Sequence, residues 1–114
     1  MSDRKLLELA AKAAGLEINA KAQAERDATM DPEEASLWLS DGTTAWNPVQ
    51  YDSDEARLEA HLSLDVQWYP ALVLVGPSGG EMHARYFKHH GGDRQAARRM
   101  AGVLAAAAIG EKMP

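Results

Sequence analysis

The sequence predicts an α+β fold in which helices pack on one face of a small antiparallel sheet. Three observations lead to this prediction. Residues 3–14 and 93–109 carry apolar side chains at helical spacing, and residues 64–89 contain alternating and β-branched runs broken by turn residues. These helices and strands also do not alternate as they would in a doubly wound parallel fold. With 114 residues, 46% of them hydrophobic, the chain is expected to form one domain over residues 1–114.

The N-terminal region is predicted to contain a helix, a strand and a loop. Residues 3–14 form the helix, and Gly15 supplies its C-cap. Over residues 16–24 apolar and polar side chains alternate, which predicts a half-buried strand. Residues 25–35 are polar and contain Asp31-Pro32, which predicts a mobile loop. A helix that continues through this segment is the alternative.

The centre of the chain is predicted to form a short hairpin followed by a helix. Residues 37–39 resemble a strand that enters a turn at Asp41-Gly42, with residues 43–46 as the return strand. Asp52 with Glu55 three residues later resembles a capping box, and the apolar spacing after it predicts a short helix.

The next segment is predicted to form a hairpin. Residues 64–68 alternate between apolar and polar side chains, residues 71–75 are continuously apolar, and Pro70 separates these two strands. The turn residues of 76–80 then lead into a partner strand over residues 81–89.

A long helix is predicted to close the chain. Asp93 is a typical N-cap, and the apolar stripe continues to about Ile109, with Gly110 as the stop. The small residues of Ala105–Ala108 permit close helix approach, so a helix-mediated homodimer is one hypothesis. Packing of these alanines on the sheet is the alternative.

The composition excludes several kinds of site. The chain has no cysteine, which rules out disulfides and thiolate chemistry and favours a cytoplasmic location. No apolar run approaches the roughly 18 residues of a membrane helix, so no membrane association is expected. His89 and His90 would point to opposite faces of a strand, and no histidine pair has helical spacing, so we predict neither a metal nor a cofactor.

Charge is divided unevenly along the chain. Residues 1–80 hold six Lys/Arg and fourteen Asp/Glu, a balance of −8, whereas residues 81–114 hold six and three, a balance of +3. A candidate basic face for phosphate or an acidic protein consists of Arg85, Lys88, Arg94, Arg98 and Arg99. A candidate acidic face for a basic partner consists of Asp52, Asp54, Glu55 and Glu59. For the acidic pairs, capping of the helix start is the alternative.

The three tryptophans are candidates either for the core or for recognition of a partner. Trp46 and Trp68 each stand just ahead of a proline that holds the chain extended, so each ring can anchor a turn to the core. The alternative for these two rings and for Trp38 is an exposed recognition surface.

Several segments resemble a known group of proteins. Trp46-Asn47-Pro48-Val49, the acidic stretch 52–55 and Leu62-Ser63-Leu64-Asp65-Val66, together with the alanine-rich ends, resemble small uncharacterised proteins of proteobacterial phages and prophages. These are similar to the NinX-type phage accessory group, which has no established activity or catalytic residues. The resemblance implies a phage-encoded protein in the host cytoplasm. Residues 24–35 and 85–90 depart from the pattern.

Three functional hypotheses follow. The first is a non-enzymatic module that binds a host protein, for example as an inhibitor of a host defence complex. The second is a nucleic-acid-binding accessory protein that uses the candidate basic face. The third is a small enzyme of unknown reaction, although no Ser-His-Asp order or nucleophile elbow stands out.

Overall fold

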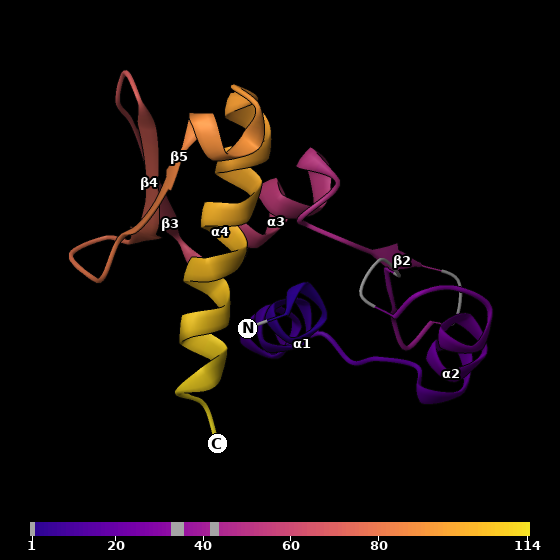
Figure 1. The fold of residues 1–114 in the computed structure, drawn as a ribbon. Coiled ribbons are helices and arrows are strands. Elements are labelled where there is room, and N and C mark those ends of the chain that lie inside the picture. The colour runs from indigo at the N-terminus through magenta and orange to yellow at the C-terminus, as the bar shows by residue number, and fades with distance from the viewer. Residues whose placement is uncertain (1, 33–35, 42–43) are drawn as a thin grey trace.

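The computed structural model describes residues 2–32, 36–41 and 44–114. Within these ranges, four α-helices and two small antiparallel sheets confirm the α+β class (Figure 1). The helices are α1 (Asp3–Ala13), α2 (Ala20–Thr29), α3 (Asp52–Leu62) and α4 (Arg94–Glu111). The strands are β1 (Leu37–Trp38), β2 (Ala45–Trp46), β3 (Leu64–Trp68), β4 (Leu72–Pro77) and β5 (His83–Tyr86), and a 3-10 helix, η1 (Phe87–His90), follows β5.

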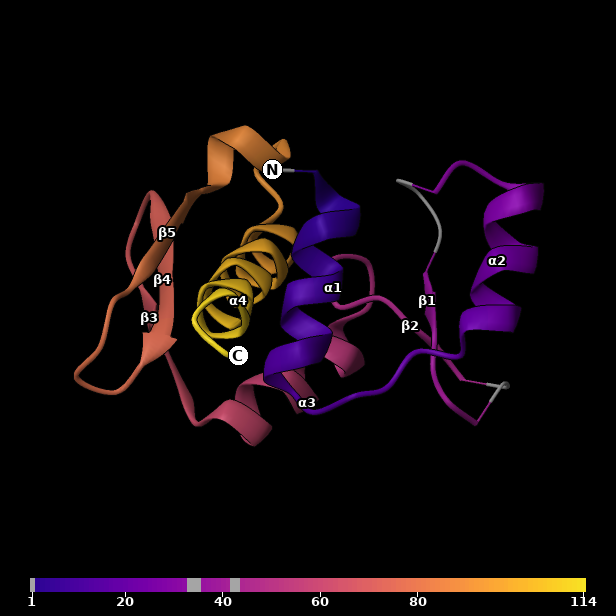
Figure 2. The same ribbon diagram turned by 90° about the horizontal axis from the view of Figure 1, so that it is seen from below.

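The helix α4 is the centre of the fold. It lies between α1 and the three-stranded sheet (Figure 2). Ala97, Ala101 and Ala105 recur at i, i+4 and i+8 on the side that packs against the sheet, while Val103 belongs to the cluster shared with α1. Two hydrophobic clusters therefore form on opposite sides of one helix, which explains the large number of small residues in α4.

The small residues at the end of α4 are used inside the chain. Ala105, Ala106 and Ala107 are at most 3% exposed, because they contact the sheet or α1. A Cβ atom on Gly110 would lie 2.0 Å from the carbonyl oxygen of Leu9, so this glycine is needed for the close crossing with α1. Three of the four alanines of the proposed dimer contact therefore pack inside the chain, as the alternative held, and only Ala108 is partly exposed.

The three-stranded sheet has the order β3-β4-β5 and is antiparallel throughout. The hairpin predicted for this segment is confirmed, but its last strand ends at Tyr86 and not at His89. Phe87 leaves the strand direction, becomes buried and donates its N–H to the carbonyl of Ala71. His89 consequently lies in η1, so our placement of it in a strand is wrong.

The predicted strand over residues 16–24 is also wrong, because α2 begins at Ala20. Asn19 caps this helix by accepting the N–H of Ala22, and alanine, lysine, glutamine and glutamate are good helix formers. Of the predicted strand only one isolated bridge is present, between Ile18 and Leu39. Local helix propensity and a good N-cap outweighed the two-residue alternation.

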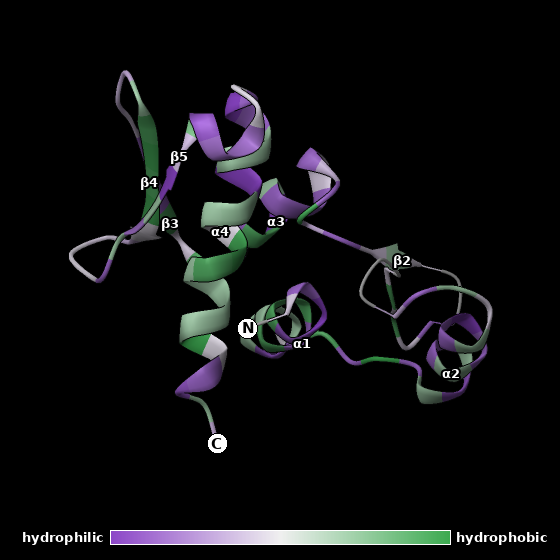
Figure 3. Ribbon diagram, viewed as in Figure 1, coloured by the Kyte–Doolittle hydropathy of each residue, from purple (hydrophilic) through white to green (hydrophobic). Residues whose placement is uncertain are grey.

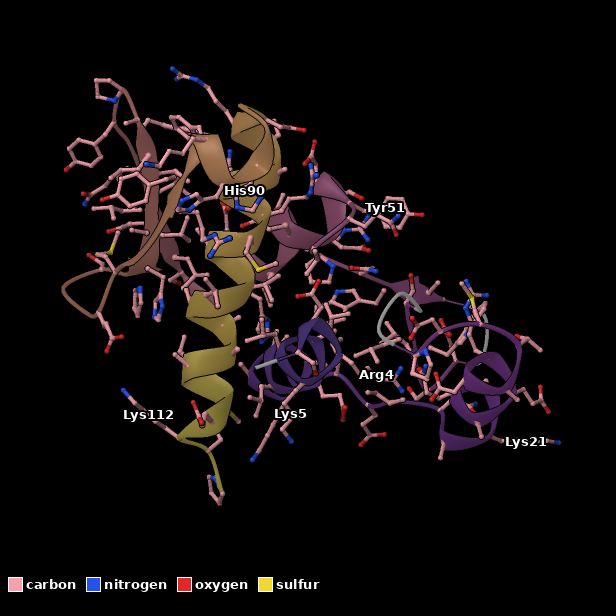
Figure 4. All side chains as sticks on the ribbon, in the orientation of Figure 1. Arg4, Lys5, Lys21, Tyr51, His90 and Lys112 are labelled. Carbon is pink, nitrogen blue, oxygen red and sulfur yellow. The ribbon has the colours of Figure 1, made fainter. Side chains whose placement is uncertain are left out.

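The predicted loop over residues 25–35 is wrong for residues 25–29, which continue α2, as the alternative interpretation held. Residues 33–35 of that prediction lie outside the described residues. The side chain of Arg4 on α1 forms two hydrogen bonds with Asp27, at 3.0 and 2.8 Å, and thereby ties α2 to α1 (Figure 4). These hydrogen bonds lower the pKa of Asp27 below its ordinary value.

The short hairpin is confirmed, since β1 and β2 pair with Leu37 opposite Trp46. Gly42 of its predicted turn and Thr43 of its return strand lie outside the described residues. The helix after it is confirmed as well, but the capping box is not. The N-cap of α3 is Tyr51, which makes no side-chain cap, and Glu55 turns into the interior of the protein.

The helix α4 confirms its predicted N-cap, because Asp93 accepts the N–H of Ala96. The helix passes through Gly110 and ends at Glu111, one residue beyond the predicted stop at that glycine. In the part of the chain that the structure describes, no helix is both long and apolar enough to cross a membrane.

Candidate functional site

The outer face of the three-stranded sheet is apolar and has no helix on it. Along β4, Val73 and Val75 are fully buried against α4, whereas Leu72 and Leu74 alternate with them and point to the opposite side. Figure 1 and Figure 2 show α4 on one side of this sheet, with none of the other described helices on the opposite side. Figure 3 shows that β4 is hydrophobic along its length.

The strand register defines which side chains share this surface. Leu72 lies opposite Tyr86, and Leu74 lies opposite both Gln67 and Ala84. We call these five residues the outer sheet face: Gln67, Leu72, Leu74, Ala84 and Tyr86. Gln67, Ala84 and Tyr86 are exposed. An apolar patch with an exposed aromatic ring is typical of a surface that contacts another protein.

Two tyrosines dominate the surface around this face. Tyr86 is 44% exposed, and Tyr69, in the connection between β3 and β4, is 47% exposed. The Tyr69 hydroxyl donates to the side chain of Gln67, and the Tyr86 ring contacts Lys88 and the edge of His89. These contacts hold both rings at the surface. Tyrosines offer large contact area at low entropic cost, so they are favoured in binding surfaces.

The structure brings the candidate basic and acidic faces together. Arg98 on α4 donates two hydrogen bonds to Glu59 on α3, at 2.8 and 2.5 Å. Arg99 donates to Asp52 at 2.7 Å and to the carbonyl oxygen of Val49 at 2.8 Å. The pairs Arg98–Glu59 and Arg99–Asp52 therefore connect α3 with α4, and their charges neutralise one another within the chain.

Glu55 is the most deeply buried member of this group, at 2% exposure. Burial, together with the adjacent Glu59 carboxyl, raises the pKa of Glu55 to about 9. Burial alone would also raise the pKa of Glu59, but the hydrogen bonds from Arg98 and Glu55 lower it below its ordinary value. The hydrogen bond to Glu59 raises the pKa of Arg98. The cluster is consequently a protonated Glu55 beside a Glu59–Arg98 ion pair.

The remaining candidate residues are dispersed among local contacts. The Arg94 guanidinium lies 4.7 Å from the centroid of the Phe87 ring, and Arg85 Nε donates to His90 Nε2 at 3.1 Å. Burial and the charge of Arg85 lower the pKa of His90. Asp54 accepts the N–H of Asn47 at 3.0 Å. The candidate residues thus serve the fold in separate places and do not form two continuous charged faces.

The tryptophans have different environments. Trp46 is 6% exposed in the core, which confirms its role as an anchor. Trp68 is 42% exposed at the end of β3, where its ring lies 6.1 Å from that of Phe87. Trp38 is partly buried, with the Arg26 guanidinium 5.1 Å above its ring. Over the described residues, no group of three or more His, Asp or Glu side chains could hold a metal ion.

Sequence reasoning missed the outer sheet face, although a signal was present. The apolar run of residues 71–75 is continuous, which is the pattern of a strand covered on both sides. Among the described residues, helices cover only one side of β4. A continuous apolar run in a strand that has a helix on one side only is therefore the signal that could have identified the surface.

The class of protein that this fold and surface define is a small α+β protein in which the described helices cover only one face of the three-stranded sheet. No protein-family model matches the chain, and neither the curated proteins nor the solved structures contain a match.

Proposed function

We propose that the protein is a non-enzymatic module that binds a partner protein through the outer sheet face. The observation that carries this proposal is the surface of Leu72, Leu74 and Tyr86 on the side of the sheet away from α4, where Tyr86 is exposed and the two leucines are half-buried. Burying apolar area contributes about 25 cal/mol per Å², so this surface supplies a driving force for association. Aromatic side chains such as Tyr69 and Tyr86 are also enriched among the residues that dominate binding energy.

The chemistry of the surface favours a partner with an apolar centre and a basic rim. Asp65 shares the outward direction of Gln67 on β3 and is exposed. The whole chain carries a formal charge of −5. A basic rim would therefore be attracted during approach, and it would select against acidic competitors.

The resemblance to phage accessory proteins supplies the biological setting of the proposal. In that setting the partner is a protein of the bacterial host, and the module acts in the host cytoplasm. Occupying the interaction surface of a host defence complex would inhibit the complex without any catalysis by the phage protein.

Nucleic-acid binding is less well supported because the candidate cations are already engaged. Arg98 and Arg99 bind carboxylates, and Arg94 lies over Phe87. A phosphate backbone would have to compete with these contacts. An enzyme is also less well supported, because the buried Glu55 and Glu59 pair lines neither the cavity beside Arg26 and Tyr51 nor the cleft beside Trp46.

The test is affinity capture from a lysate of a proteobacterial host with matched surface variants. The double variant Leu74→Asp/Tyr86→Ala alters the outer sheet face, and Lys21→Ala on the exposed side of α2 is the control. We expect the wild type and the control to retain the same stoichiometric protein and the double variant to lose it. Circular dichroism and thermal unfolding establish that all three chains are folded.

Three outcomes would overturn the proposal. The first is retention of the captured protein by the double variant. The second is a dimer of the protein itself that the double variant abolishes, since the face would then be covered by a second copy. The third is salt-sensitive retention of DNA that Lys88→Ala weakens, with no captured protein.

A further inference from the structure

A second surface feature lies away from the outer sheet face, on the other side of α4. It is a cavity of about 620 Å³ between α1, α2 and the turn that leads into α3. Its walls include Leu7, Arg26, Met30, Val49, Tyr51 and Arg99. The volume lies within the roughly 300–1,000 Å³ that small-molecule sites occupy.

Among the described residues, none accepts a hydrogen bond from the Nε atom of Arg26 in this cavity. Its Nε atom is buried without a hydrogen-bond partner, and among the described residues no carboxylate forms a salt bridge with it. A guanidinium group has five N–H donors and no acceptor, and buried donors in folded proteins are nearly always satisfied. The guanidinium is held in position by the Trp38 ring, 5.1 Å away. The missing partner is therefore a group that accepts hydrogen bonds from a fixed cation.

Arg99 adds a second guanidinium to the wall, and its orientation is fixed as well. Its Nε donates to the Val49 carbonyl oxygen and its Nη1 to Asp52, so neither contact uses Nη2. Asp52 balances the charge of Arg99, and Asp3 places one carboxylate on the cavity wall. Recognition in this cavity consequently depends on directed N–H donors more than on a strong positive field.

The rest of the wall is suited to an apolar or aromatic body. Tyr51 is 52% exposed and Met30 is 39% exposed, and Val49 also lines the cavity, where its carbonyl oxygen accepts a hydrogen bond from Arg99. Figure 4 shows Tyr51 beside the start of α3. A ligand body that covers these side chains would remove apolar surface from water, while its charged end reaches the guanidinium groups.

We propose that this cavity binds a small organic oxyanion. Its carboxylate or phosphate group accepts hydrogen bonds from Arg26 and Arg99, and its aromatic or apolar body lies against Tyr51 and Met30. Carboxylates and phosphates share the geometry of paired oxygen acceptors that a guanidinium group recognises. This site is independent of the outer sheet face and needs no partner protein.

The test is an NMR titration that observes the arginine Nε–Hε signals. The probes are benzoate and phenyl phosphate, with phenol and sodium chloride as controls for the ring and for ionic strength. We expect a saturable shift of the Arg26 and Arg99 signals with at least one of the two oxyanions, together with a change in Trp38 fluorescence. Saturation by benzoate alone would define a carboxylate site, and saturation by phenyl phosphate alone a phosphate site.

Matched variants separate a site from general anion binding. Arg26→Gln should weaken binding by about tenfold or more, and Tyr51→Ala should weaken the aromatic probes while leaving α2 intact. Lys21→Gln is the control, because Lys21 lies on the same helix as Arg26 and points away from the protein (Figure 4). The proposal fails if neither oxyanion gives a saturable shift, if sodium chloride reproduces the shift, or if both site variants bind as the wild type does.

Discussion

Gly102 on α4 leaves the space that the Glu55 carboxyl on α3 fills. A Cβ atom on Gly102 would lie 2.0 Å from Glu55 Oε1, so the Glu55 carboxyl can occupy this place only because position 102 has no side chain. The same approach places Arg98, four residues earlier on α4, against Glu59, four residues after Glu55 on α3. One glycine therefore makes room for a polar cluster of three side chains.

The first prediction concerns this glycine. We expect Gly102→Ala to lower the free energy of unfolding by about 1–3 kcal/mol, because the buried Glu55 carboxyl must move. Alanine favours a helix by about 1 kcal/mol over glycine, so a loss of stability would show that packing outweighs propensity. The measurement is urea unfolding followed by circular dichroism.

A double-mutant cycle identifies the cause of that loss. In Glu55→Ala the carboxyl is absent, and adding Gly102→Ala should then cost less than it does in the wild type. Gly110→Ala is the control, because its clash is with the backbone oxygen of Leu9, and Glu55→Ala should not relieve it. Equal costs of Gly102→Ala in both backgrounds would contradict the assigned contact.

The second prediction is a dependence of stability on pH. The pKa of Glu55 is about 9 in the folded protein, against an ordinary value of 4.5. Between these pH values the folded carboxyl holds a proton that the unfolded chain has released, so the stabilisation present below the ordinary pKa is lost as the pH rises. The lowered pKa of Glu59 acts in the opposite sense and at lower pH, where its contribution is lost as the pH falls.

Glu55→Gln should remove this dependence. The amide is neutral at every pH, so we expect a flatter stability profile between about pH 5 and 9, with a gain at pH 8 on the order of 1–3 kcal/mol. The profile is measured by urea unfolding at a series of pH values. Glu8→Gln, an exposed carboxylate on α1, is the control that should keep the wild-type slope. A variant profile parallel to that of the wild type would exclude Glu55 as the source.

The third prediction concerns the ion pair that accompanies Glu55. Arg98→Ala leaves the Glu59 carboxylate, whose side chain is 10% exposed, without its counterion. We expect a loss of about 2 kcal/mol, less than for a fully buried pair because the Arg98 side chain is 30% exposed. Arg98→Lys should recover only part of it, since lysine cannot form the two parallel hydrogen bonds. Urea unfolding at pH 7 measures both.

Arg94→Ala is the matched control for this ion pair. Arg94 lies on the same helix, is exposed and contacts the Phe87 ring, so its removal should cost roughly 0.5–1 kcal/mol. Equal losses for Arg98→Ala and Arg94→Ala would refute the special role of the Glu59 contact.

The sequence predicted the elements whose local signals agree with their tertiary environment. The helix α4 has an N-cap, a periodic apolar stripe and many alanines, and the β4-β5 hairpin has the turn residues of 76–80 between its two strands. The strand predicted over residues 16–24 failed because alanine occupies alternate positions. Alanine is small enough to suit either period, so the alternation contained little information, and helix propensity with the Asn19 cap decided the structure.

The site was harder to predict because the sequence does not show which acidic and basic side chains contact each other in the fold. The acidic residues of α3 and the basic residues of α4 are about 40 positions apart, as Glu59 and Arg98 show, and only the packing of the two helices joins them. A local count of charges therefore could not show that Arg98 and Arg99 contact Glu59 and Asp52, while the other three basic candidates make contacts elsewhere.

The fourth prediction separates the two faces of β4. Leu74 and Val75 are neighbours on one strand, but Leu74 belongs to the outer sheet face and Val75 is fully buried against α4. We expect Leu74→Thr to change the free energy of unfolding by roughly 0.5 kcal/mol or less, because threonine is β-branched, a shape that strands favour. Val75→Thr should cost about 1–3 kcal/mol, because it buries a hydroxyl group in an apolar cluster. Thermal and urea unfolding measure both variants.

If Leu74→Thr cost as much as Val75→Thr, the outer sheet face would be part of the stabilising core, and a leucine there would need no partner to explain it. A small cost, together with loss of the captured host protein, would mean that this leucine serves binding and not folding.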